Sequence, residues 1–195
     1  MIPNLKITTP SGYMTSDCLS EEFMHRRIYI SGEITDITAF EICCQINQLA
    51  SINNEDIIIW IQSQGGSVTA GLAIIDTMRT CGCDICTVVM GNAASMGAVI
   101  SSSGTKGKRF VGLSAEVMIH QAIGGVSGQT TDILRTAKHI SKVNNRLYSI
   151  LAENTGKNIE QISNDCDRDY FLNAEESIKY GLADHIFTGF NTLNT

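Results

Sequence analysis

Five consecutive apolar residues, Ile57 to Ile61, constrain the fold of this 195-residue chain more than any other feature. A strand without polar alternation is typical of a sheet that is covered on both faces, as parallel sheets are. Similar β runs are expected at residues 28–30 and 85–90, and helical periodicity separates the three runs at residues 36–49 and 68–78. Strands that alternate with helices at this spacing predict an α/β fold of βαβ units with a mainly parallel sheet.

A long amphipathic helix is expected in the second half of the chain, over residues 130–153. Its apolar residues are more than a projecting helix could leave in water, so this face needs a partner, either the domain's own core or another subunit. A glycine-rich segment at residues 124–129 precedes this helix. The shorter elements are expected as strands near residues 109–111 and 116–119 and as helices near residues 95–103, 159–164 and 174–180.

Composition excludes several classes of function. Fourteen Lys and Arg against twenty Asp and Glu give a net charge of −6 with no basic run, which argues against nucleic acid and anionic membranes as partners. No apolar stretch approaches the ~20 residues that span a bilayer. The opening residues lack the regions of a signal peptide, so a cytoplasmic protein is expected. The length suits one domain, over residues 21–195, after a flexible N-terminal segment at residues 1–20.

The seven cysteines do not form a disulfide pattern, because their number is odd and their spacing is irregular. Cys81, Cys83 and Cys86 form a C-x-C-x-x-C cluster that could suggest a metal site. No histidine or second cysteine pair follows at ligand spacing, so these thiols are predicted to be small hydrophobes rather than metal ligands. The glycine pair at residues 65–66 lacks the further residues of a nucleotide-binding loop, so no cofactor is predicted.

Three places combine backbone freedom with groups that can do chemistry. Gly65-Gly66, between a strand and a helix, can form a tight turn or bring bare backbone N–H groups close to a ligand. Ser95 lies at the start of a helix, where a serine caps the helix or acts as a nucleophile. His120 ends an apolar strand, either as a core histidine or as the base that a serine needs. Spacing does not choose a carboxylate partner among Asp165, Asp167, Asp169 and Asp184.

Six motifs follow one another in a distinctive order: TAGLAIIDTM, GNAASMGAVI, GTKGKRF, MIHQAIGG, GQTTDI and DRDYFLNAEESIKYGLAD. In order and spacing they resemble the proteolytic subunit of the Clp protease, the ClpP family, from about residue 27 to residue 184. The resemblance implies a ClpP/crotonase-like spiral of βαβ units with a projecting handle helix, the handle covering about residues 123–154.

The resemblance also implies a role for individual residues. Ser95 would be the nucleophile, His120 the general base and Asp169 the residue that orients the histidine. The backbone N–H groups of Gly66 and Met96 would bind the oxyanion, where one donor contributes about 3 kcal/mol. The implied activity is that of a serine endopeptidase that works through an acyl-enzyme.

Assembly and partners follow from the same resemblance. Extended substrate would add as a strand between Val68 and the segment from Ile123 to Gly125, with little sequence choice. Two stacked heptameric rings, joined by the handle and by an ion pair at Arg168, would enclose the active sites. An AAA+ unfoldase of the Clp type would deliver unfolded polypeptides, and any ATP requirement would belong to that partner.

The sequence departs from the family pattern at several positions. Gln64 and Ala122 stand where prolines are usual, the aromatic pair before the glycines is Ile58 and Trp60, and residues 17–24 replace the usual entry sequence. These differences suggest a divergent second copy that works with another ClpP subunit. The alternatives are a weakly active or structural paralogue that needs a partner subunit, and a crotonase-type acyl-CoA enzyme, which does not need a serine and a histidine together.

Overall fold

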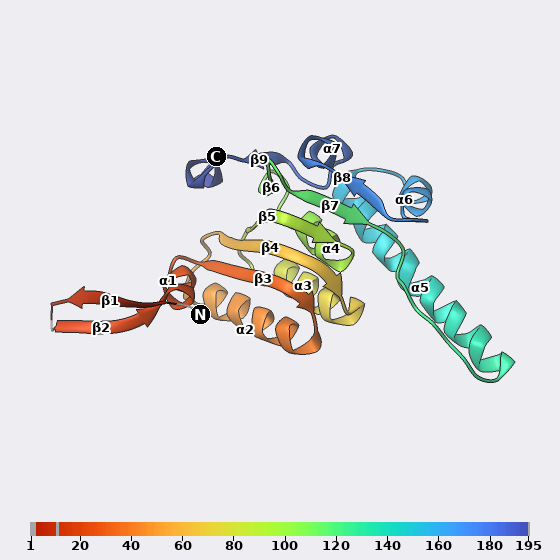
Figure 1. The fold of residues 1–195 in the computed structure, drawn as a ribbon, viewed down its shortest axis with the longest axis horizontal. Coiled ribbons are helices and arrows are strands. Elements are labelled where there is room, and N and C mark those ends of the chain that lie inside the picture. Colours follow the sequence, from red (N-terminus) through yellow and green to blue (C-terminus); the bar gives the residue numbers. More distant parts are fainter. Residues whose placement is uncertain (1–2, 11, 195) are drawn as a thin grey trace.

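A mainly parallel sheet forms the centre of the molecule (Figure 1). The computed structural model describes residues 3–10 and 12–194, and five strands run parallel in the order β3-β4-β5-β6-β9. The second half of β5 also pairs in parallel with β7, which pairs antiparallel with β8. The bounds are β3 Arg27–Ile34, β4 Ile57–Gly66, β5 Ile85–Ala94, β6 Arg109–Gly112, β7 Glu116–Ile119, β8 Tyr170–Leu172 and β9 His185–Phe187. The predicted α/β fold of βαβ units is confirmed.

Helices α2, α3 and α4 cover one face of this sheet (Figure 1). α2 begins with a capping box, in which Thr35 and Thr38 bond each other's backbone N–H groups, and α3 begins at the hydroxyl of Ser67. These caps start each helix directly after a strand, which keeps the βαβ connections short. The bounds are α2 Asp36–Ile52, α3 Val68–Thr80, α4 Met96–Ser102, α6 Ile159–Asp165 and α7 Ala174–Tyr180.

The two faces of β4 are covered unequally. Ile57, Ile59 and Ile61 point to the helices and are 0–1% exposed. Trp60 lies on the opposite face and is only half-buried. Its indole contacts Phe187 of β9 and Phe190 of the short helix η1 (Phe190–Asn194), with ring centroids 5.1 and 5.8 Å apart. The expectation of full cover on both faces is therefore met by helices on one side and by a thin aromatic layer on the other.

The N-terminal residues form regular structure that the sequence did not indicate. β1 (Asn4–Thr9) and β2 (Gly12–Asp17) pair as an antiparallel hairpin, and α1 (Cys18–Met24) follows. Asp17 caps α1, since its carboxylate accepts from the backbone N–H of Ser20 at 3.0 Å. The hairpin is almost fully exposed, so no apolar alternation reveals it in the sequence. The division into a flexible N-terminal segment and one domain remains a prediction.

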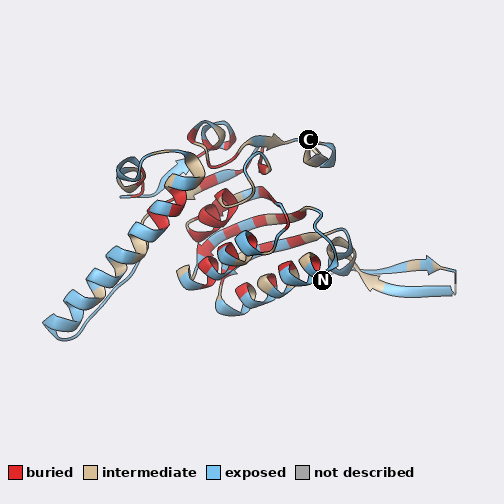
Figure 2. Ribbon diagram, turned by 180° about the vertical axis from the view of Figure 1, so that it is seen from behind, coloured by how far each residue is buried: buried red, intermediate tan, exposed pale blue. Residues whose placement is uncertain are grey.

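The long helix α5 (Thr130–Thr155) projects from the body of the molecule (Figure 2). Its buried residues all lie near its C-terminus, at Leu147, Tyr148, Ile150 and Leu151. Leu134, near its start, is 65% exposed. The domain's own core therefore buries only the last turns of the apolar face of α5, and the rest of that face is exposed in the single chain. None of the helices in the described residues combines the length and the apolarity needed to cross a membrane.

A buried ion pair joins the C-terminal part of the chain to the sheet. Arg109 on β6 is 2% exposed and holds Asp184 through two bonds, Nε to Oδ2 at 2.8 Å and Nη2 to Oδ1 at 2.5 Å. Its Nη1 also donates to the carbonyls of Ser102 and Asn154, at the ends of α4 and α5. Burial opposes ionisation of Asp184, but the hydrogen bonds and the charge of Arg109 outweigh it and hold its pKa below the ordinary value.

We expect Arg109→Met to lower the free energy of unfolding by about 3–5 kcal/mol, because it leaves the Asp184 carboxylate buried without its partner. Asp184 has a lowered native pKa, so its stabilising effect is present above the unfolded-state pKa of about 3.9 and is lost as pH falls below it. Urea denaturation at neutral and acidic pH measures both effects. Arg79→Met is the control, since the Arg79–Glu153 pair is exposed and contributes at most about 1 kcal/mol. Equal losses for the two variants would contradict this account.

Candidate active site

Three parallel strands end at one edge of the sheet, where ligands bind in open α/β sheets. β4 ends at Gly66, β5 ends just before Ser95, and β7 ends just before His120. The backbone N–H of Ser95 donates to the carbonyl of Met118 at 2.8 Å. Ser95 therefore lies one strand spacing, about 4.8 Å, from the strand that leads into His120. The glycine turn, the serine and the histidine, remote in sequence, share this edge.

Ser95 occupies a strained position on the turn between β5 and α4. Its φ of 54° and ψ of −123° lie outside the regions that most residues adopt, a cost of about 1–3 kcal/mol. Although Ser95 stands at the N-cap position of α4, its side chain makes no capping hydrogen bond. Its Oγ has no hydrogen-bond partner in the part of the chain that the structure describes. The hydroxyl is thus free at the helix start, which does not fit a capping role.

His120 is paired with a carboxylate. Its Nδ1 lies 3.0 Å from Oδ1 of Asp169, with the imidazole side chain 12% exposed and the carboxylate 58% exposed. A carboxylate at Nδ1 favours the tautomer that carries its proton there, which leaves Nε2 as an acceptor. This is the form of histidine that can take a proton from a hydroxyl.

The structure separates the four candidate aspartates. Asp165 accepts from the hydroxyl of Tyr180 at 2.6 Å, and Asp184 binds Arg109. Asp167 contacts its neighbour Arg168, while Asp169 is the one that reaches His120. The antiparallel pairing of β7 with β8 explains this choice, because it places Ile119 opposite Tyr170 and so brings Asp169, the residue just before β8, to the end of β7.

The glycine pair packs against the serine turn. Gly65 and Gly66 have φ of +96° and +151°. A Cβ on Gly65 would lie 2.7 Å from Cβ of Ser95 and 3.0 Å from the backbone nitrogen of Met96, and one on Gly66 would lie 2.2 Å from the carbonyl oxygen of Ile34. Both positions therefore require glycine. The sequence singled out the glycine pair and the resemblance gave Gly66 a role, but neither indicated that Gly65 packs directly against Ser95.

Ser63 holds the glycine turn through two hydrogen bonds of its hydroxyl, a role that the sequence did not predict. It is 1% exposed, and its hydroxyl donates to the carbonyl of Gly32 at 2.6 Å while it accepts from the N–H of Gly65 at 3.0 Å. These two bonds fix the path of the backbone into the turn. No apolar or charged pattern marks a buried serine of this kind, so the sequence alone could not single it out.

The predicted substrate walls differ in structure. Val68 is the first residue of α3 and packs against the core, whereas Ile123 is 86% exposed. Residues 120–127 belong to no helix or strand within the described chain, so Gly125 also lies in an open segment. Arg168 is exposed as well, and its Nη1 donates to the carbonyl of Asp167 at 2.7 Å and lies 3.3 Å from Oδ2 of the same residue. Of the four, Val68 alone packs against the core, and Ile123, Gly125 and Arg168 are exposed.

The serine and the histidine are close but not joined in this single chain. Within the described residues no hydrogen bond links Ser95 Oγ to His120. A catalytic contact of this kind is often long in an unliganded enzyme and tightens when substrate binds. The single chain therefore brings Ser95 and His120 to one edge of the sheet without a hydrogen bond between them.

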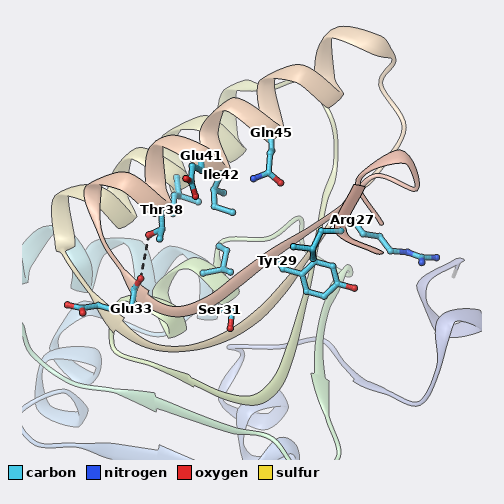
Figure 3. Close-up of a pocket in the computed structure, with 11 residues that line it drawn as sticks. Arg27, Tyr29, Ser31, Glu33, Thr38, Glu41, Ile42 and Gln45 are labelled. Carbon is cyan, nitrogen blue, oxygen red and sulfur yellow. Dashed lines mark hydrogen bonds between the residues drawn. The ribbon is translucent and has the colours of Figure 1, made fainter. Parts of the chain in front are cut away.

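Enclosed space in the molecule lies elsewhere. A cavity of about 440 Å³ lies between α2 and β3, and the residues that line it include Glu41, Ile42 and Gln45 of the helix and Tyr29 and Ser31 of the strand (Figure 3). None of the predicted catalytic residues lines it. Ser95 and His120 lie at the ends of strands β5 and β7, away from this cavity.

The clustered cysteines are part of the packing. Cys83 and Cys86 are buried and Cys81 is half-buried, in agreement with their prediction as small hydrophobes. Burial raises the pKa of the Cys86 thiol to about 12, so this thiol stays protonated at neutral pH. No group of three or more metal-ligating side chains occurs among the described residues.

A serine on a strained turn, a histidine paired with a carboxylate and two bare glycines are the parts of a serine hydrolase. The family model described as Clp protease matches residues 11–189. The ATP-dependent Clp protease proteolytic subunits of Streptococcus pyogenes serotype M5 (strain Manfredo) and serotype M49 (strain NZ131) are each 47% identical to this chain over 189 residues, which cover 95% of it and 96% of each relative. The chain belongs to the Clp protease family of serine peptidases.

Proposed function

We propose that this chain is the proteolytic subunit of a compartmentalised, unfoldase-coupled protease of the cytoplasm, with Ser95 as nucleophile, His120 as general base and Asp169 as the residue that orients it. The observation that carries the proposal is the 3.0 Å contact between His120 Nδ1 and Asp169 Oδ1, at the strand end beside the free hydroxyl of Ser95. Membership of a peptidase family makes the crotonase-type alternative wrong.

In the proposed reaction, Nε2 of His120 takes the proton from Ser95 Oγ as the oxygen attacks the scissile carbonyl. The backbone N–H groups of Gly66 and Met96 stabilise the resulting oxyanion. His120 then gives its proton to the departing amine, which leaves an acyl-enzyme on Ser95. Water, deprotonated by His120, then attacks the ester. The tetrahedral intermediate that results collapses, His120 returns the proton to Ser95 Oγ, and the peptide leaves with a free carboxyl group.

Substrate would bind mainly through its main chain. An extended polypeptide laid between Val68 and the segment from Ile123 to Gly125 can exchange backbone hydrogen bonds with both. Such bonds do not depend on side chains, so the site would accept many sequences. The open edge at residues 120–127, which has no strand partner in the described structure, supports this role. Unfolded proteins are the substrates that present such segments.

Assembly into two stacked heptameric rings is part of the proposal. The exposed apolar residues of the handle, about residues 123–154, support it, because Leu134 and Val126 are 65% and 40% exposed in the single chain. The Arg168 side chain is 84% exposed and pairs only with its neighbour Asp167 among the described residues, so it can also reach a carboxylate of another ring. The relatives are named as ATP-dependent, which supports a Clp-type AAA+ unfoldase as the partner that consumes ATP.

A subunit that cleaves slowly until it meets a second ClpP subunit is the other candidate, and the unmade Ser95–His120 bond favours it. The test is to measure the native mass of the purified protein and its hydrolysis of a small fluorogenic peptide, alone and with a second ClpP subunit. A tetradecamer that hydrolyses the peptide by itself supports the first proposal. If the protein hydrolyses the peptide only in the presence of a second ClpP subunit, the alternative is supported. If it hydrolyses the peptide under neither condition, both proposals are contradicted.

A further inference from the structure

The carboxylate of Asp169 is weakly held for a residue that orients a base. It is 58% exposed, and within the described residues its hydrogen bond to His120 is the only one it makes. By contrast, the carboxylate of Asp184 accepts four bonds, two from backbone N–H groups and two from Arg109. The orientation of Asp169 must therefore come from the backbone that carries it.

That backbone is held by two hydrogen bonds from Gln121, the residue directly after His120. The N–H of Gln121 donates to the carbonyl of Cys166 at 2.7 Å, and its side-chain Nε2 donates to the carbonyl of Asp167 at 2.9 Å. On the other side of Asp169, Tyr170 pairs with Ile119 in the β7–β8 ladder. The turn is thus fixed on both sides of Asp169 by three attachments, and one of the three is a side chain.

The carbonyl of Asp167 also accepts from Arg168 Nη1 at 2.7 Å. The Arg168 side chain is 84% exposed, so water competes for this bond and it adds little rigidity. The bond from Gln121 is exposed too, but Gln121 is half-buried and its backbone N–H is fixed on the carbonyl of Cys166, so its amide reaches the Asp167 carbonyl from an anchored position. Of the two side chains that reach this carbonyl, Gln121 is therefore the one that can hold the turn in place.

We propose that Gln121 is a positioning residue that sets the distance between the imidazole of His120 and the carboxylate of Asp169, a role that rests on the proposed function. Its backbone follows directly from His120, and its amide holds the turn that leads into Asp169. A change in either bond moves the carboxylate relative to the ring. Gln121 itself does not touch the reacting atoms.

Gln121→Met tests this role, because it keeps the backbone N–H bond and the chain length but removes the side-chain donor. We expect kcat for a fluorogenic peptide to fall about 10- to 100-fold while KM changes less than about 2-fold, since a 1 Å misplacement has effects of this size. Gln121→Lys retains a donor of similar reach and should recover most of the rate. Gln161→Met is the matched control, because that exposed glutamine on α6 makes no side-chain hydrogen bond among the described residues.

A spectroscopic signal separates positioning from a general loss of structure. The low-field proton resonance of His120 Nδ1–H, assigned by its absence in His120→Ala, should weaken or move in Gln121→Met and stay unchanged in Gln161→Met. Native mass and thermal unfolding check that the variants fold and assemble. If Gln121→Met does not fold or assemble, Gln121→Glu replaces it, because glutamate is isosteric with glutamine and lacks the donor. The same fall in kcat and the same change in the resonance are expected.

Two results would overturn the positioning role: a folded Gln121→Met with wild-type kcat and resonance, or a Gln121→Lys as slow as Gln121→Met. Both leave the proposed function intact, because the wild-type protein still hydrolyses the peptide. If the wild type itself, alone or with a second ClpP subunit, neither hydrolyses the peptide nor reacts at Ser95, the proposed function fails first.

Discussion

Replacing Ser95 with alanine is expected to lower kcat/KM for a fluorogenic peptide by about 10⁴- to 10⁶-fold, the loss seen when the nucleophile of a serine peptidase is removed. The variant keeps the fold, because the Ser95 side chain makes no hydrogen bond within the described structure. Its thermal stability should stay close to that of the wild type, since no side-chain hydrogen bond is lost. The measurement is steady-state hydrolysis at equal subunit concentration, with thermal unfolding as the check on the fold.

Ser103→Ala is the control for this variant. Ser103 ends the same helix, α4, and its hydroxyl bonds the carbonyl of Val99 at 2.7 Å. It lies away from the strand ends, so its loss should leave the rate within about 3-fold of wild type, as surface and cap changes do. A Ser95→Ala enzyme that retained a tenth or more of the wild-type rate would exclude Ser95 as the nucleophile.

Gly65→Ala is expected to lower kcat/KM by about 10²- to 10³-fold or more, the effect of losing one oxyanion donor. The added Cβ would lie 2.7 Å from Cβ of Ser95 and 2.8 Å from the carbonyl of Ala94, so the serine turn and the backbone nitrogen of Met96 must shift. The positive φ of +96° adds strain of about 1–3 kcal/mol. Hydrolysis rates and thermal unfolding measure the two effects separately.

Gly82→Ala separates backbone strain from the effect on the site. Gly82 has a similar φ of +80°, but a Cβ there would meet nothing within 4 Å among the described atoms. This variant should lose stability to a comparable degree and keep its peptidase rate. If Gly65→Ala and Gly82→Ala lost the same activity relative to wild type, the proposed contact between the glycine turn and the oxyanion site would be wrong.

The central elements of the fold were predictable because they carry long patterns. The apolar run from Ile57 to Ile61 and the helix over Ala174–Tyr180 lie where the sequence placed them. The three-residue strands β8 and β9 were missed, since so short a segment has no measurable periodicity and forms only because a neighbouring strand pairs with it. The N-terminal hairpin was missed for the opposite reason, as its exposed strands bury no apolar face.

The site was predictable in part. Ser95 and His120 follow strands that the sequence identifies, so their shared edge could be expected from parallel topology. The choice of Asp169 depends on the β7–β8 pairing, which the residues alone do not reveal and which the family resemblance supplied. The close approach of Gly65 to Ser95 and the contact of Gln121 with Asp167 were not predictable, because they depend on distances between backbone segments that no residue pattern encodes.

The central claim is that the hydroxyl of Ser95 is activated by His120, and covalent labelling tests it most directly. The protein, alone and with a second ClpP subunit, would be treated with a fluorophosphonate, and the modified peptide would be identified by mass spectrometry. We predict a single adduct on Ser95, absent in Ser95→Ala and much slower to form in His120→Ala. An unlabelled Ser95 under both conditions, or labelling that proceeds equally well in His120→Ala, would contradict the account.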